Sequence, residues 1–169
     1  MARKLTNPLS QRERISHAFS RLAYGMRPGD MDRVLESGLD AWIEDQLGEK
    51  EETNPDLLDR LNEFETLDMD VAECAEFTYS LSPFVTGADR EKLTEEEKRA
   101  DRLQRRIPKE ELVQSIALRA VLSRRQVTEV LSDFWRNHFN VSYTKGDSIL
   151  SQITDYHREV IRENVWRSF

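Results

Sequence analysis

The chain has 169 residues, of which 34% are charged, and its formal net charge is −7. A chain of this length can bury a core within one domain, and its 38% content of hydrophobic residues excludes disorder by composition. It contains no apolar run of about 18 residues, so we expect no membrane span. Basic residues alternate with acidic ones instead of forming a stripe, which excludes nucleic acid as a partner.

The scarcity of turn-forming residues favours helices. Glycine and proline number only 6 and 5, whereas an all-β fold needs a turn every few residues. Long stretches rich in Glu, Arg, Leu and Ala are typical of helices. The predicted fold class is all-α: an irregular array of about seven to eight helices without a sheet, in a single helical domain over residues 1–169.

Three short helices are predicted in the first part of the chain. Ser10 and Glu13 have the S-x-x-E spacing of a capping box, which predicts the start of a helix that ends near Ala23. The next two helices are expected at residues 28–38, after a proline, and at residues 39–47, before a glycine.

The middle of the chain becomes increasingly charged. Asn54 and Pro55 predict the start of a fourth helix, and residues 66–80 have a weaker helical pattern. From Asp89 to Glu111, 16 of 23 residues are charged, eight of each sign. Over residues 89–107 we therefore expect an exposed helix with ion pairs between its turns, or a mobile arm.

Three more apolar helices are predicted after Pro108. The second of them follows a turn at residues 123–126, and its apolar positions include Phe134, Trp135 and His138. Their helical spacing predicts that they face the core. The last helix is expected to begin near Asp147.

Charge is distributed unevenly along the chain. Residues 40–76 carry a net charge of −12, whereas residues 98–169 carry +5. Segments of opposite sign can pack against each other, can each face a different partner, or can simply be solvated surfaces.

The segment Phe134–Asn140 is the densest in chemically useful groups, with three aromatic rings, a histidine, an arginine and two asparagines. His138 is the candidate catalytic residue, because a histidine can act as a general base or a ligand near neutral pH. The opposite interpretation is a core histidine. Candidate binding residues in this segment are Trp135, Arg136, Asn137 and Asn140, the last of which could equally cap the helix end.

A second candidate binding pair is His17 and Arg21, one helical turn apart. The two could hold a ligand anion, or an acidic group of residues 40–76. With His157, the chain has three histidines, but the Glu-x-x-His and His-Glu-x-x-His spacings of metal sites are absent. We therefore expect no metal, and no cofactor is indicated.

Several segments resemble a known family. HAFSRLAYG (17–25), PGD (28–30), GLDAWIEDQL (38–47), FWRNHF (134–139) and IREN (161–164) are similar, in the same order, to segments of the bacterial family catalogued as domain of unknown function 1800. Members of that family are typically several hundred residues long. The resemblance therefore implies that this chain is the N-terminal portion of a larger family domain.

Because that family has no established activity, two functions stay open. The first is a structural or interaction module, whose partner is a protein: the remaining C-terminal portion or another subunit. The alternative is the N-terminal half of an enzyme, with His138 as acid–base or ligand and Arg21 or Arg136 binding an anion. A cut interface would expose an apolar patch.

The absence of a signal segment predicts a cytoplasmic location; many members of the family look exported, which is the alternative.

Overall fold

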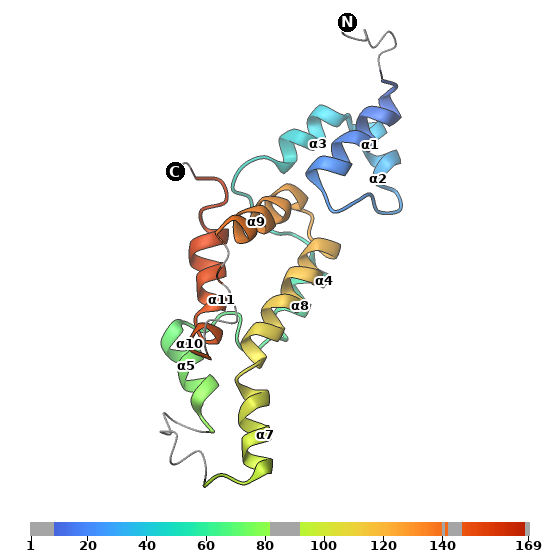
Figure 1. Cartoon of the computed structure of the whole chain (residues 1–169). Helices are drawn as coiled ribbons and strands as arrows, with labels where there is room; N and C mark the ends of the chain where they lie inside the picture. The colour runs from blue at the N-terminus through green and yellow to red at the C-terminus, as the bar shows by residue number, and fades with distance from the viewer. Residues whose placement is uncertain (1–8, 82–91, 140, 142–146, 168–169) are drawn as a thin grey trace, which may run out of the picture.

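The computed structural model describes residues 9–81, 92–139, 141 and 147–167, and within these ranges it contains helices and no strand (Figure 1). This confirms the predicted all-α class. No described helix is long and apolar enough to cross a bilayer. The elements in chain order are α1 (Gln11–Leu22), α2 (Asp30–Ser37), α3 (Leu39–Gln46), α4 (Pro55–Leu61), α5 (Val71–Tyr79), α7 (Glu95–Gln104), α8 (Ile107–Leu122), α9 (Gln126–His138), α10 (Asp147–Leu150), α11 (Ile153–Asp155) and the π-helix η1 (Tyr156–Arg162).

Residues next to the helix starts determine where α1 and α2 begin. The predicted capping box is confirmed, since the Ser10 hydroxyl accepts from the Glu13 N–H at 3.3 Å and the Glu13 carboxylate accepts from the Ser10 N–H at 2.8 Å. Helix α2 begins at Asp30 instead of residue 28, because Gly29 adopts a φ of 87° that interrupts a helix. The Asp30 carboxylate then accepts the Arg27 N–H at 2.8 Å.

Helices α1, α2 and α3 form a unit at one end of the molecule (Figure 1). Their shared core consists of Ile15, Phe19, Val34 and Trp42, each at most 8% exposed. The Phe19 and Trp42 rings are stacked, with centroids 4.3 Å apart. Burial of each of these side chains stabilises the fold by about 1.5–3 kcal/mol, so the three short helices depend on one another.

Helix α8 is the support for the middle of the chain, since α4 and α5 both pack against it. Leu57 of α4 and Leu112 of α8 are buried in this region. The Glu111 carboxylate accepts the Thr66 N–H at 2.7 Å and the Thr66 hydroxyl at 2.6 Å, which fixes the segment between α4 and α5. Cys74 of α5 is buried, and desolvation raises the pKa of its thiol.

The charged segment forms helix α7, which packs against α5 through its last turn. Asp101 is only 1% exposed, and its carboxylate accepts from Arg105 Nε at 2.9 Å. The Arg105 guanidinium lies 4.7 Å from the centroid of the Tyr79 ring, and the Gln104 amide donates to the Phe77 carbonyl. The expected exposed helix is therefore anchored at one end, by charged and polar groups instead of by its leucines.

The C-terminal segment differs from the single regular helix that was predicted. A turn at residues 151–152 separates α10 from α11, and residues 156–162 form a π-helix. The Glu163 N–H accordingly donates to the Arg158 carbonyl, five residues earlier, at 3.2 Å. A π-helix has a wider turn than an α-helix, so residues four and five apart share a face.

The acidic and basic segments do contact each other. Arg125, at the start of α9, pairs with Asp45 of α3 at 3.3 Å. The carboxylate of Glu52 accepts from the Arg124 N–H at 3.0 Å. The long connection between α3 and α4 is thus held to the turn between α8 and α9, and the two segments of opposite charge contact each other here.

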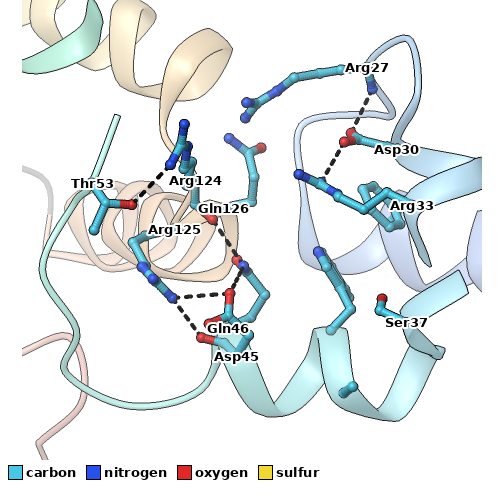
Figure 2. A pocket seen from close by; sticks show the side chains of 13 residues that line it. Arg27, Asp30, Arg33, Ser37, Asp45, Gln46, Thr53, Arg124, Arg125 and Gln126 are labelled. Atoms are coloured by element: carbon cyan, nitrogen blue, oxygen red, sulfur yellow. Dashed lines mark hydrogen bonds and ion pairs between the residues drawn. The ribbon is translucent and has the colours of Figure 1, made fainter. Parts of the chain in front are cut away.

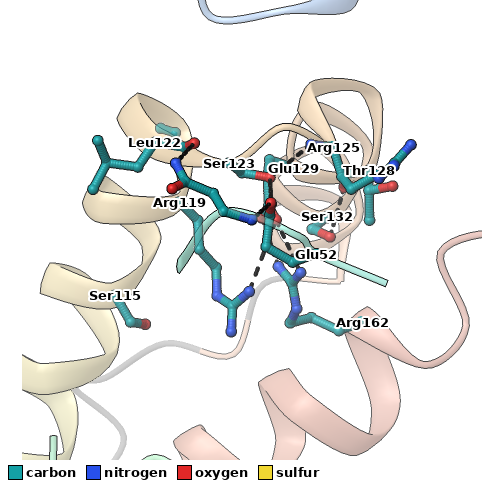
Figure 3. A network of polar contacts seen from close by, with 12 residues as sticks. Glu52, Ser115, Arg119, Leu122, Ser123, Arg125, Thr128, Glu129, Ser132 and Arg162 are labelled. Carbon is teal, nitrogen blue, oxygen red and sulfur yellow. Dashed lines mark hydrogen bonds and ion pairs between the residues drawn. The ribbon is translucent and has the colours of Figure 1, made fainter. Parts of the chain in front are cut away.

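A buried ion pair joins α9 to the C-terminal helix (Figure 3). The Glu129 carboxylate, 6% exposed, accepts from Arg162 Nη1 at 2.6 Å and from Nη2 at 3.0 Å. Arg119 of α8 lies 4.0 Å from the same carboxylate. One acidic group therefore draws together three helices.

Glu129→Gln should lower the free energy of unfolding by about 3–5 kcal/mol, because it leaves two guanidinium groups beside an amide that cannot balance them. The measurement is urea unfolding monitored by circular dichroism. Glu159→Gln is the matched control, since Glu159 pairs with Arg158 at the surface, and it should cost no more than about 1 kcal/mol. Equal losses in the two variants would contradict the importance assigned to the buried pair.

Candidate functional site

The side of helix α9 that packs against the neighbouring elements carries mostly polar residues. Its buried residues are Gln126, Val127, Glu129 and Ser132. Phe134 is 54% exposed, and His138 is also exposed. The prediction that Phe134, Trp135 and His138 form an inward stripe is therefore wrong for Phe134 and His138.

The orientation of α9 has a physical reason, because its buried polar groups are matched by partners on other elements. Gln126 donates to the Ser123 carbonyl at 2.8 Å and accepts the Tyr24 N–H at 3.1 Å. Glu129 is held by Arg162. Rotating the helix to bury its rings would strand these groups without hydrogen bonds, which costs about 1–3 kcal/mol for each neutral group and more for the carboxylate.

The rings at the end of α9 form a continuous cluster. Phe134 and Trp135 meet edge to face with centroids 4.9 Å apart, and Trp135 stacks on Phe139 at 5.7 Å. The His138 ring lies 4.8 Å from Phe139 and 5.8 Å from Trp135. Among the described residues, its ring nitrogens make no hydrogen bond and its ring contacts are aromatic.

A groove of about 410 Å³ runs between this cluster and the π-helix. Trp135 and Phe139 line one wall, and Tyr156, Val160 and Ile161 line the other. The Tyr156 hydroxyl donates to the Phe139 carbonyl at 3.2 Å, which ties the two walls together. Val160 is 49% exposed, so the groove is apolar and open. We call Trp135, Phe139, Tyr156, Val160 and Ile161 the aromatic groove.

The other predicted residues of this segment lie outside the groove. Arg136 and Asn137 both bind the carboxylate of Asp133 on the same helix. Asn140 lies outside the described residues. The structure therefore groups only Trp135 and His138 of the predicted set with the exposed rings.

His17 and Arg21 are exposed on α1. Within the part of the chain that the structure describes, neither side chain makes a hydrogen bond or an ion pair; only the His17 carbonyl does, by accepting from the Ser20 hydroxyl. The structure does not bring the pair against residues 40–76. Their role as a ligand-binding pair stays a prediction.

The third histidine, His157, is buried in η1 at 6% exposure. Desolvation, reinforced by the positive charges of Arg162, Arg136 and Arg119, lowers the pKa of its imidazole to about 3. It is therefore a neutral ring at physiological pH. Among the described residues, no group of three or more His, Cys, Asp or Glu side chains could hold a metal ion.

A polar cleft of about 390 Å³ was not predicted (Figure 2). It lies between α2, α3 and the start of α9, and Arg27, Arg33, Arg124 and Arg125 are among its lining residues. Asp30 holds Arg33 at 2.6 Å, Asp45 holds Arg125, and Arg27 donates to the Leu122 carbonyl. Each of these contacts joins one helix to another or closes a turn, so the cleft is a joint between the N-terminal unit and the α8–α9 turn.

Two segments that carried the family resemblance contribute to this joint. Asp30 of PGD caps the loop before α2, and Gln46 near the end of GLDAWIEDQL donates to the Arg124 carbonyl at 2.9 Å. Gln46 is 3% exposed. The sequence signal for this buried hydrogen bond was the position of Gln46, a polar residue at the end of a helix with apolar residues on one side.

Gln126→Ala should destabilise the fold by about 1–3 kcal/mol, because it strands the Tyr24 N–H and the Ala120 carbonyl and removes one of the hydrogen bonds to the Ser123 carbonyl. Hydrogen exchange should show faster exchange of the α1–α3 amides. The control Gln114→Ala, at an exposed position of α8, should leave both readouts unchanged. Unaltered exchange in α1–α3 of Gln126→Ala would argue against the joint.

The stability of the protein should fall on acidification through His157. An unfolded histidine titrates near 6.5, whereas the folded pKa is about 3. Between these values the unfolded chain binds a proton that the folded chain does not, so the free energy of unfolding falls as pH drops, by up to about 1.4 kcal/mol per unit.

Urea unfolding between pH 7 and about 4.5 measures this slope. His157→Gln removes the group and should flatten the profile, whereas His17→Gln, at an exposed site, should keep it. A slope that persists in His157→Gln would assign the acid sensitivity to other groups.

Comparison with known proteins identifies the family of the chain. No curated protein and no solved structure matches the chain. The model of the family described as "Protein of unknown function (DUF1800)" matches residues 17–169, which include the aromatic groove and the joint. The chain therefore belongs to the DUF1800 family.

Proposed function

We propose that this protein is an interaction module, in which the aromatic groove binds an apolar segment of a partner protein. The observation that carries the proposal is the inverted orientation of α9. Gln126, Glu129 and Ser132 are buried, whereas Phe134 and Phe139 are exposed and gain little stability from burial within the chain itself.

The composition and shape of the groove support a protein partner. Aromatic residues are enriched at the centres of protein interfaces, where a few large side chains supply most of the binding energy. Here Phe134, Trp135 and Phe139 contact one another, so their positions are already set before binding. Preordered rings lose little conformational entropy on association, which favours affinity. Asn164 and Arg167 supply the polar rim.

An acid–base role of His138 in an enzyme stays a prediction. A general base is normally oriented by a hydrogen bond from a carboxylate or carbonyl. Within the described residues, His138 contacts rings and has no such hydrogen bond. The interaction module is therefore the better supported of the two functions.

A photo-crosslinking residue placed at position 139 should give discrete protein crosslinks in cells that produce the protein naturally, because Phe139 lines the groove. Val121, which is 65% exposed on α8, is the matched control position and should give few crosslinks. Mass spectrometry of the products identifies the partner and separates a segment of the same polypeptide from another subunit.

The variant Val160→Glu should reduce crosslinking from position 139, since a charge in the opposite wall of the groove disfavours binding of an apolar segment. Circular dichroism checks that this variant folds, as expected for a change at the exposed Val160. Equal crosslinking from positions 139 and 121, or crosslinking that Val160→Glu leaves unchanged, would overturn the proposal.

A further inference from the structure

A separate cavity of about 250 Å³ lies among α4, α8 and the C-terminal helix. Its apolar wall includes Leu58, Leu61 and Leu112, and its polar wall includes Ser115, Arg119 and His157. We call it the Arg119 cavity. None of its residues was singled out for binding by the sequence, apart from His157 as one of three histidines.

Arg119 reaches from α8 into the space between α8 and the C-terminal helix (Figure 3). Its contact with Glu129 is long, at 4.0 Å, and that carboxylate already accepts two short hydrogen bonds from Arg162. The Arg119 guanidinium makes no hydrogen bond to a described residue, although it has five N–H donors. Desolvation and the charge of Arg162 lower its pKa to about 10, so it remains cationic at neutral pH.

His157 is the second unmatched group of this cavity. His157 is only 6% exposed, and neither ring nitrogen has a hydrogen-bond partner among the described residues. Because His157 lines the cavity, its unpaired ring nitrogens can hydrogen-bond to a ligand there. Because the ring is neutral, it offers one donor and one acceptor.

The charges around the cavity limit what can bind beside Arg119. Arg162 is paired with Glu129, and Arg158 with Asp155 at 2.7 Å. The carboxylates of Asp68 and Glu163 also line the cavity and are exposed. They repel a multiply charged anion more strongly than a singly charged one, so a ligand with one negative charge fits best beside Arg119.

We propose that the Arg119 cavity binds the carboxylate of a small organic acid. Arg119 pairs with both carboxylate oxygens, for which the planar guanidinium is suited, and the N–H of His157 donates to one of them. The hydrocarbon part of the acid lies against the leucine wall. This site does not depend on the aromatic groove or on a protein partner.

Sodium butanoate is the probe, added to the whole chain at constant ionic strength and pH 7 and followed by proton NMR of the histidine rings. The His157 resonance should shift and saturate, whereas those of His17 and His138, which are exposed elsewhere, should stay in place. Butanoate should bind more tightly than acetate, because its chain covers more of the leucine wall. Phosphate should bind more weakly.

Arg119→Gln should weaken butanoate binding about tenfold or more, as expected for loss of a charged hydrogen-bonding group. Arg106→Gln, which removes an exposed charge beside the same helix, is the matched control and should bind normally. If Arg119→Gln fails to fold, the butanoate titration of the wild-type protein followed by NMR still tests the proposal.

Three results would overturn the proposal. The first is the absence of a saturable His157 shift at about 50 mM butanoate. The second is phosphate binding as tight as that of butanoate. The third is unchanged binding in a folded Arg119→Gln variant.

Discussion

The buried carboxylate of Glu129 is the constraint on which the arrangement of the C-terminal half depends. A charge with 6% exposure must be compensated within the protein, and Arg162 does so with two hydrogen bonds from the C-terminal helix. Because Glu129 belongs to α9, this pair sets both the position of the helix and its rotation about its axis. The joint at Gln126 sets the same rotation from the other end of α9.

Both candidate sites follow from that rotation. With Glu129 inward, Phe134 and His138 lie outward, and the groove against the π-helix forms on the exposed side. On the inner side, two guanidinium groups approach one carboxylate. Arg162 lies closer to the Glu129 carboxylate than Arg119 does, so the N–H donors of Arg119 stay available beside the cavity. The rotation of α9 thus accounts for both the groove and the charged cavity.

The elements that were predicted well are those whose signals are local. The capping box of Ser10 and Glu13 and the Asn54-Pro55 helix start require only neighbours in the sequence. The faces of α9 were mispredicted because its partners are distant: Tyr24 lies 102 residues before Gln126, and Arg162 lies 33 residues after Glu129. An apolar stripe predicts the buried face of a helix only when no other face carries polar groups that must pair with distant residues. Arg119 had no sequence signal, since a lone arginine on an apolar helix is usually a solvated one.

The π-helix carries one residue more in its turn than an α-helix would need to cover the same axial length. That extra residue lets His157 and Arg162, five apart, face the same cavity, while Tyr156 and Val160 face the groove. In an ordinary α-helix, residues five apart are rotated by about 140° from each other, so His157 and Arg162 would face different sides. The π-helical turn is therefore what allows both side chains to line one cavity.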